Sequence, residues 1–289
     1  MSDVLQSIQW FPGHMAKTKR KIKEILPLID AVAEVVDARI PISSRNPDLN
    51  EIIGAKPHII LLNKCDMADT KVTGEWIRYY KSQGITAIGI DCRSGKGLST
   101  FKNTVKTVLA DRLEYYREKG MAGKPLRVMV AGIPNVGKSS FINRIAGNNK
   151  AKVENRPGVT RGNQWFTIDK QLELLDTPGV LWPKFEDKTV GEHLAFTGAV
   201  KDRVFDTELL SVRLMEILGE NYPDLLEARY GKLNFSDGSY GLLCQIGKKR
   251  GMMIRGGEID TERVSNMILE EYRNCKIGNI SLERVDENA

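Results

Sequence analysis

The sequence predicts an α/β fold, a mainly parallel sheet with helices on both faces, followed by a small all-α domain. Two observations carry this prediction. In the first part of the chain, short apolar runs rich in β-branched residues alternate with helical patterns, the order that is typical of a parallel sheet. From about residue 190 such runs no longer recur, and helical periodicity takes over.

Each strand is expected where a short apolar run ends at a polar loop. The strands expected in the first half are 31–38, 58–64, 85–91 and 125–132, and the helices are 47–54, 70–84, Leu98–Tyr116 and the segment after GIPNVGKSS. The runs NQWFTID and QLELLDTPG predict a hairpin about the turn at Asp169–Lys170. Loops at the carboxyl ends of parallel strands are the usual place for a ligand.

The chain is expected to have three structurally distinct parts. Residues 1–28 form a basic N-terminal arm or helix, residues 29–185 the α/β domain, and residues 186–289 a helical C-terminal domain. Within the last part, one apolar helix face is expected at Val264, Met267, Ile268 and Tyr272.

Composition excludes several classes of protein. The chain is 41% apolar and 28% charged, which is typical of a globular protein, and no apolar run is long enough to span a bilayer. The N-terminus lacks the pattern of a secretory signal. Four scattered cysteines, without a CxxC pair, argue against a disulfide framework or a zinc site and suit a reducing, cytoplasmic location.

A phosphate-binding loop is predicted by GIPNVGKSS (132–140), which matches G-x-x-x-x-G-K-[ST] between a strand and a helix. Backbone N–H groups of such a loop surround phosphate oxygens, and the following helix N-terminus favours the anion. Lys138 would neutralise the β- and γ-phosphates, and the Ser139 hydroxyl would bind Mg²⁺. The residues expected to contact the nucleotide here are Asn135, Val136, Gly137, Lys138, Ser139 and Ser140.

The base is specified by Asn63-Lys64-Cys65-Asp66, at the end of the strand HIILL. The Asp66 carboxylate can accept hydrogen bonds from guanine N1–H and the 2-amino group, and adenine offers neither donor, so the carboxylate would be left unpaired. Asn63 would tie this loop to the phosphate loop, and the stem of Lys64 would cover the base. Together the two motifs predict a GTP site.

Three further segments complete the expected site. Asp176, in the segment DTPG, would hold Mg²⁺ through a water, and the Gly179 N–H would meet the γ-phosphate. Thr160, in a polar loop between the other motifs, would be the second hydroxyl ligand of Mg²⁺, although a lone loop threonine is uninformative by itself. Asp91-Cys92-Arg93 fits the loop whose backbone supports guanine O6, or else is a solvent-facing turn.

The order of these motifs is permuted relative to Ras-type GTPases, since the guanine loop at 63–66 precedes the phosphate loop at 132–139. Opening the chain after DTPG and joining the old termini leaves the sheet intact. With WFPGHMAK at the start and DARIPISSRNP at 37–47, the chain resembles the circularly permuted GTPases of ribosome assembly. The resemblance implies a Ras-like P-loop domain, GTP hydrolysis stimulated by the large (50S) ribosomal subunit precursor, and a C-terminal domain that contacts ribosomal RNA.

Hydrolysis needs another device than the Ras-type glutamine, because DTPG is followed by Val180. The resemblance offers His14 as the catalytic residue, and a neutral imidazole can accept or relay a proton of water near pH 7. Otherwise His14 is a surface or RNA-contacting residue. The resemblance also implies that Asn135 helps hold a K⁺ near the phosphates; from sequence alone, Asn135 could equally be a turn former.

Two basic segments suit RNA phosphates: Lys17–Lys23, and an expected flexible loop at Gly247–Gly257. The first also suits a solvated helix face or an anionic membrane surface. Two functions therefore stay open: an assembly GTPase that cycles on the ribosomal particle, and a GTP-dependent binding module that acts on a membrane or protein partner. The family resemblance favours the first and RNA over a membrane. A metabolic P-loop kinase is disfavoured by the guanine loop.

Overall fold

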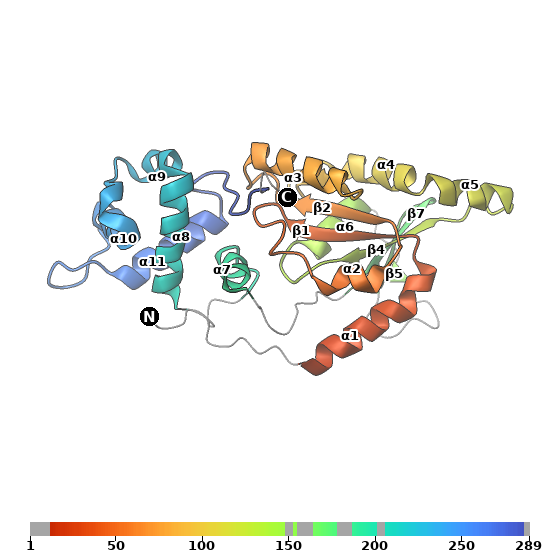
Figure 1. Ribbon diagram of the computed structural model, residues 1–289, viewed down its shortest axis with the longest axis horizontal. Coiled ribbons are helices and arrows are strands. Elements are labelled where there is room, and N and C mark those ends of the chain that lie inside the picture. Colours follow the sequence, from red (N-terminus) through yellow and green to blue (C-terminus); the bar gives the residue numbers. More distant parts are fainter. Residues whose placement is uncertain (1–11, 148–152, 155–163, 178–186, 201–205, 286–289) are drawn as a thin grey trace. The chain divides into compact units, whose positions relative to one another are not determined.

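The computed structural model describes residues 12–147, 153–154, 164–177, 187–200 and 206–285, without the side chains of 12–18 and 153–154. The chain divides into two compact units between Thr177 and Asp187, and Glu283–Val285 return to the first unit. The first unit contains the sheet, and the second consists of helices (Figure 1). Among the described residues, no helix is long and apolar enough to cross a membrane.

The sheet of the first unit has seven strands in the order β3-β2-β1-β4-β7-β6-β5. The strands are β1 (Ala31–Asp37), β2 (His58–Asn63), β3 (Thr86–Gly89), β4 (Leu126–Ala131), β5 (Val153–Glu154), β6 (Gln164–Asp169) and β7 (Leu172–Asp176). β3, β2, β1, β4 and β7 are parallel, while β6 and β5 are antiparallel to their neighbours. The predicted mainly parallel sheet and the hairpin are confirmed, with the hairpin turn at Lys170–Gln171.

Six α-helices and one short 3-10 helix are described in this unit: α1 (Pro12–Ile25), η1 (Leu26–Leu28), α2 (Asp48–Ile53), α3 (Thr70–Ser82), α4 (Leu98–Val108), α5 (Ala110–Glu118) and α6 (Lys138–Ala146). The single helix expected over Leu98–Tyr116 is wrong, because the backbone leaves the helical region at Leu109 (φ −107°, ψ 26°). The apolar pattern continues on both sides of Leu109, at the buried residues Phe101, Val105 and Tyr116. The pattern therefore gives no sign that the helix is interrupted.

Helices cover both faces of the sheet, as predicted. On one face, β1 side chains such as Val32 and Val36 pack against buried residues of α1, α2 and α3. Because side chains alternate along a strand, Ala33 and Val35 point to the other face. α6 packs beside β6 and β7, and the rings of Phe101 in α4 and Phe141 in α6 meet edge to face at 5.0 Å.

The second unit is helical, as expected, with α7 (Lys188–Phe196), α8 (Thr207–Asn221), α9 (Pro223–Tyr230), the 3-10 helix η3 (Phe235–Asp237), α10 (Gly238–Lys249) and α11 (Thr261–Arg273). Asp206 and Asp260 cap α8 and α11 by accepting from backbone N–H groups. The apolar face expected on α11 is confirmed: Val264, Ile268 and Tyr272 are buried in the core of this unit, and Met267 packs against it.

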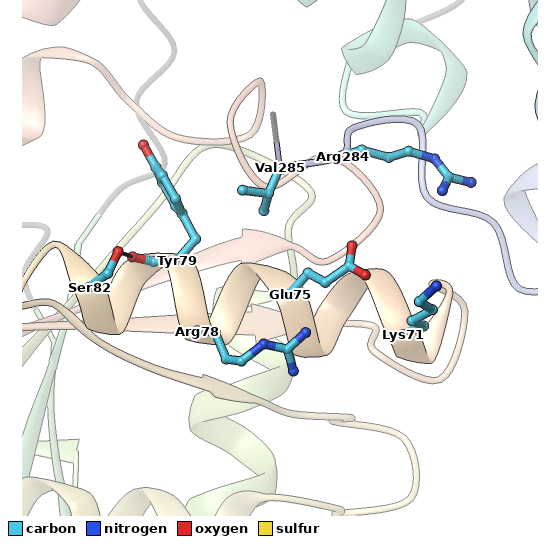
Figure 2. Close-up of a pocket in the computed structure, with 7 residues that line it drawn as sticks. All are labelled: Lys71, Glu75, Arg78, Tyr79, Ser82, Arg284 and Val285. Atoms are coloured by element: carbon cyan, nitrogen blue, oxygen red, sulfur yellow. Dashed lines mark hydrogen bonds between the residues drawn. The ribbon is translucent and has the colours of Figure 1, made fainter. Parts of the chain in front are cut away.

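The chain returns to the first unit at Glu283. The Glu283 carboxylate accepts from the backbone N–H groups of Ile42 (2.5 Å) and Ser43 (3.0 Å) and from the Ser43 hydroxyl, while the Trp76 indole donates to the Glu283 carbonyl (3.1 Å). Figure 2 shows Arg284 and Val285 lying over α3. They complete a shallow hollow of about 780 Å³ whose other lining residues are Lys71, Glu75, Arg78, Tyr79 and Ser82. The expected 186–289 domain therefore ends in a segment that packs on the sheet unit.

Candidate functional site

The predicted motifs gather at one edge of the sheet. The segment 63–66 follows β2, Asp91 follows β3, the loop 132–137 joins β4 to α6, and Asp176 ends β7. Since these strands are parallel neighbours around β1, their carboxyl ends meet at the same edge. The topology thus brings together segments that are more than a hundred residues apart.

The phosphate loop has a backbone that only small residues allow at two places. Gly132 has φ +144°, and a Cβ there would lie 2.4 Å from the Val35 carbonyl oxygen. Gly137 has φ +101°, and a Cβ there would lie 2.3 Å from Nδ2 of Asn63. Asn135 also takes a left-handed conformation (φ 63°), which asparagine tolerates better than most residues. The loop therefore turns tightly against β1 and against the guanine loop.

Lys138 begins α6 and points back over this loop. Its ammonium group donates to the carbonyl oxygens of Gly132 (2.9 Å) and Ile133 (2.8 Å). Burial lowers the pKa of Lys138 to about 8, against the opposing effect of the Asp176 carboxylate. Ser139 and Ser140 follow on the first turn of α6 and are exposed. A cation and exposed hydroxyls beside a helix N-terminus form a site for an anion.

The guanine loop is bound directly to the phosphate loop. The Asn63 amide donates to the Val136 carbonyl oxygen at 2.7 Å, and the Lys64 ammonium donates to the Asn135 carbonyl oxygen at 3.2 Å. Asp66 lies in the turn that follows Lys64, with one carboxylate oxygen buried. The contact between the two loops that the sequence predicts for Asn63 is present.

The loop after β3 lies against the guanine loop, since the Cys65 N–H donates to the Ile90 carbonyl at 3.2 Å. The Asp91 carboxylate accepts from the N–H groups of Arg93 (2.7 Å) and Ser94 (3.1 Å). Burial alone raises the pKa of Asp91, but the Ser94 side chain and these backbone hydrogen bonds outweigh it and lower the pKa. Its side chain thus stabilises its own turn. Burial raises the pKa of the Cys92 thiol to about 12, which keeps it a thiol.

Oxygen donors that suit Mg²⁺ lie beside the phosphate loop. Among the described residues, Oδ1 of Asp176 is buried and has no hydrogen-bond partner. Burial raises the pKa of Asp176, although Lys138 and the Thr177 N–H oppose this effect. A cation would favour the ionised carboxylate, so Asp176 together with the Ser139 hydroxyl fits Mg²⁺. The described part of the chain has no group of three or more His, Cys, Asp or Glu residues that could hold a metal ion by itself.

Three predicted residues cannot be placed in this geometry. Thr160 and Gly179 lie outside the described residues. His14 is in the first turn of α1, but its side chain is outside the part that is described. Their roles stay predictions.

Comparisons with known proteins identify the family. Residues 127–216 match the family described as 50S ribosome-binding GTPase. Ribosome biogenesis GTPase A of Priestia megaterium is 47% identical over 97% of this chain and 98% of its own length, and that of Thermotoga maritima is 31% identical over 97% and 95%. The chain belongs to the ribosome biogenesis GTPase A family. It is a GTPase.

Solved structures confirm the fold of this ribosome biogenesis GTPase A member. Two YlqF structures, one bound to GDP and one, from T. maritima, bound to GNP, are 28% identical to the chain and give TM-scores of 0.66 and 0.61. They cover 92% and 93% of this chain, and 99% and 98% of their own chains are matched. The likeness spans both units, so the predicted circularly permuted GTPase fold with a helical C-terminal region is confirmed.

Asp37 and Arg39 are buried beside the guanine loop of this family member, and the sequence alone gave them no role. They lie in the segment DARIPISSRNP, which was informative only as part of the family pattern. Their ion pair, at 2.8 Å, is local, but their place beside the guanine loop follows from the register of β1 and β2, which pairs Asp37 with Asn63. In the sequence, their position is marked only by the change from apolar residues to Asp-x-Arg at the end of a predicted strand.

Proposed function

We propose that this GTPase acts in late assembly of the large ribosomal subunit, binding the precursor particle in its GTP state and hydrolysing GTP on it. The observation that carries the proposal is the 47% identity to ribosome biogenesis GTPase A across nearly the whole chain, including the permuted order of the site. Ribosomal RNA is the proposed partner of the helical unit, whose α10 ends in Lys248 and Lys249 and is followed by Arg250, all three exposed. The site of action is then the cytoplasm.

In the proposed mechanism the chain binds GTP at its guanine base and at its phosphates, and thereby orients it. Asp66 accepts from guanine, the backbone of residues 135–140 surrounds the phosphates, and Lys138 exchanges its two carbonyl partners for phosphate oxygens. Ser139, Asp176 and Thr160 would hold Mg²⁺, which supplies charge neutralisation on the phosphates when bound. The Gly179 N–H would meet the γ-phosphate. Asp91-Cys92-Arg93 would support guanine O6 through its backbone.

The water that attacks the γ-phosphate needs a residue to orient it, and we propose His14 for this role. Adding large ribosomal subunits is expected to raise the turnover of the wild-type protein by at least tenfold. The variant H14A should lose most of that stimulation, with stimulated turnover lowered by about a hundredfold or more, because general acid–base groups contribute about 10²–10⁴-fold. Its affinity for GTP should be unchanged. Turnover is measured as phosphate release, and affinity by titration with a fluorescent GTP analogue.

Two results would count against this proposal. Wild-type protein that large subunits fail to stimulate would favour the alternative function, a GTP-dependent module that acts on a membrane or protein partner. Stimulated turnover that is equal in H14A and wild type would remove His14 from the mechanism while leaving the ribosomal role in place.

A potassium ion near the phosphates is proposed to supply charge that an arginine supplies in other GTPases, with Asn135 as a ligand. Asn135 is an exposed residue of the phosphate loop with a left-handed backbone conformation. Turnover in K⁺ should exceed turnover in Na⁺ at equal ionic strength by several-fold, and the variant N135A should abolish the difference. Equal rates in the two salts would show that Asn135 serves the turn only.

A further inference from the structure

The end of β1 lies directly beside the guanine loop. β1 and β2 pair in parallel with Asp37 opposite Asn63, the first residue of that loop, and the Ala38 N–H donates to the Asn63 carbonyl at 2.8 Å. Asp37 is itself fixed, because its backbone N–H donates to Oγ of Ser44 at 2.9 Å. A side chain at position 37 therefore has a constant position relative to the guanine loop.

Asp37 is a buried, ionised carboxylate with two cationic partners. It is 2% exposed and accepts from Nε (2.9 Å) and Nη2 (2.8 Å) of Arg39 and from Nζ of Lys64 (2.9 Å). Burial alone raises the pKa of Asp37, but the charges of Arg39 and Lys64 outweigh it and hold the pKa below its usual range. The carboxylate is thus charged at neutral pH and is bonded to the lysine of the guanine loop.

Lys64 has an unfavourable backbone conformation that its contacts stabilise. Its φ is +60°, in the left-handed region that is unfavourable for a residue with a Cβ. Its ammonium group bridges the Asp37 carboxylate and the Asn135 carbonyl oxygen of the phosphate loop. Asp66 follows two residues later in the same turn, so relaxation of Lys64 would move the carboxylate that faces the guanine base.

We infer that Asp37 is a positioning residue for guanine recognition: it anchors Lys64 and thereby sets the place of the Asp66 carboxylate. It does not touch the nucleotide. The bridge also makes the guanine loop, the phosphate loop and the end of β1 one connected unit. The inference rests on Asp66 reading guanine and is independent of the ribosomal partner.

Binding of inosine nucleotides tests whether Asp66 is correctly placed. Their base, hypoxanthine, keeps the N1–H of guanine but lacks the 2-amino group that Asp66 accepts from. Wild-type protein should bind GDP more tightly than IDP by about tenfold or more, the worth of one hydrogen bond to a charged group. The variant D37N should lower GDP affinity about tenfold and bring the GDP-to-IDP affinity ratio close to one. Both dissociation constants are measured by calorimetric titration, with thermal unfolding of each variant alongside.

Glu34→Gln provides a matched control on the same strand. Glu34 is a fully buried carboxylate that accepts from Nε of Arg45 at 3.0 Å and lies 3.2 Å from Nε2 of His58. Burial raises its pKa, but His58 and Arg45 outweigh this and lower it, as the cations do for Asp37. E34Q should therefore destabilise the unit comparably while leaving the GDP-to-IDP ratio unchanged.

Two further variants separate positioning from stability. D37N leaves Arg39 buried without its carboxylate, which can prevent folding, whereas D37N/R39M removes both charges and should recover stability. The double variant should still have a low GDP-to-IDP ratio. In a K64M background, D37N should change that ratio by less than twofold, because the anchor has already been lost.

The outcomes test the role of Asp37 separately from the recognition of guanine by Asp66. The positioning role alone would be overturned if wild type has a high GDP-to-IDP affinity ratio and both D37N and D37N/R39M keep it. It would also be overturned if E34Q lowers that ratio as much as D37N does. Equal binding of GDP and IDP by the wild-type protein would overturn both the role of Asp66 and this inference.

Discussion

Replacing Gly137 by alanine is expected to weaken GDP and GTP binding by about a hundredfold, the scale of losing one or two hydrogen bonds to a charged phosphate group. The new Cβ would lie 2.3 Å from Nδ2 of Asn63, and the backbone there has φ +101°. The Asn63 amide cannot move away without losing its 2.7 Å hydrogen bond to Val136, which joins the guanine and phosphate loops. The substitution therefore damages both halves of the site. Affinity is measured by titration of a fluorescent GDP analogue.

Gly84→Ala controls for backbone strain. Gly84 also has positive φ (+73°), but a Cβ there would meet no heavy atom within 4 Å, and the residue lies between α3 and β3. The variant at Gly84 should lose stability through its backbone conformation alone, and the variant at Gly137 should lose more, because its Cβ also meets Asn63. Only the variant at Gly137 should lose nucleotide affinity. Affinity that falls equally in the two, or in neither, would contradict the proposed contact between the loops.

The variant D66N is expected to lower affinity for guanine nucleotides by about 10³-fold or more and to favour xanthine nucleotides instead. The Asp66 carboxylate accepts from two donors on guanine, whereas an asparagine presents an NH₂ group that faces the 2-amino group. Xanthine carries an oxygen at that place, which accepts from the amide. Sites built to hydrogen-bond a substrate group reject analogues that lack it by about 10⁴–10⁵. Competition of GDP, XDP and ADP against a labelled nucleotide gives the three affinities.

Asp69→Asn is the matched control, three residues further along the chain. Asp69 caps α3 by accepting from the N–H groups of Lys71 (2.8 Å) and Val72 (3.3 Å), so the same chemical change is made outside the site. It should leave the preference among bases unchanged, because asparagine is also a good N-cap. A D66N variant that still prefers GDP over XDP would show that another group reads the base.

The sequence predicted the parts of the fold that depend on local pattern. Continuous apolar runs marked β1, β2 and β4, because a parallel strand that is buried on both faces has no polar alternation. The glycine and lysine of the phosphate loop were predicted because their chemistry demands those residue types. The helix break at Leu109 was missed, since an apolar residue stands at the break and no glycine or proline marks it.

Features that depend on register or on distant segments could not be predicted. Asp37 and Lys64 are far apart in sequence and become partners only because β1 and β2 pair in parallel with their ends level. The packing of Glu283 on Ile42 and Ser43 joins residues about 240 positions apart, and a glutamate near the end of a polar segment carries no sign of it. In both cases the information lies in the topology of the fold.

The return of Glu283 to the sheet unit has a consequence for the order of folding during synthesis. A ribosome delivers β1, β2 and β4 first, and domains generally fold as units while the chain emerges. Residues 42 and 43, however, receive their carboxylate partner only from Glu283, which is made after all of α7–α11. The nucleotide-binding unit is thus begun first and completed last. A nascent chain stalled before Glu283 can form the sheet, but it lacks the final contacts of the loop that follows Asp37.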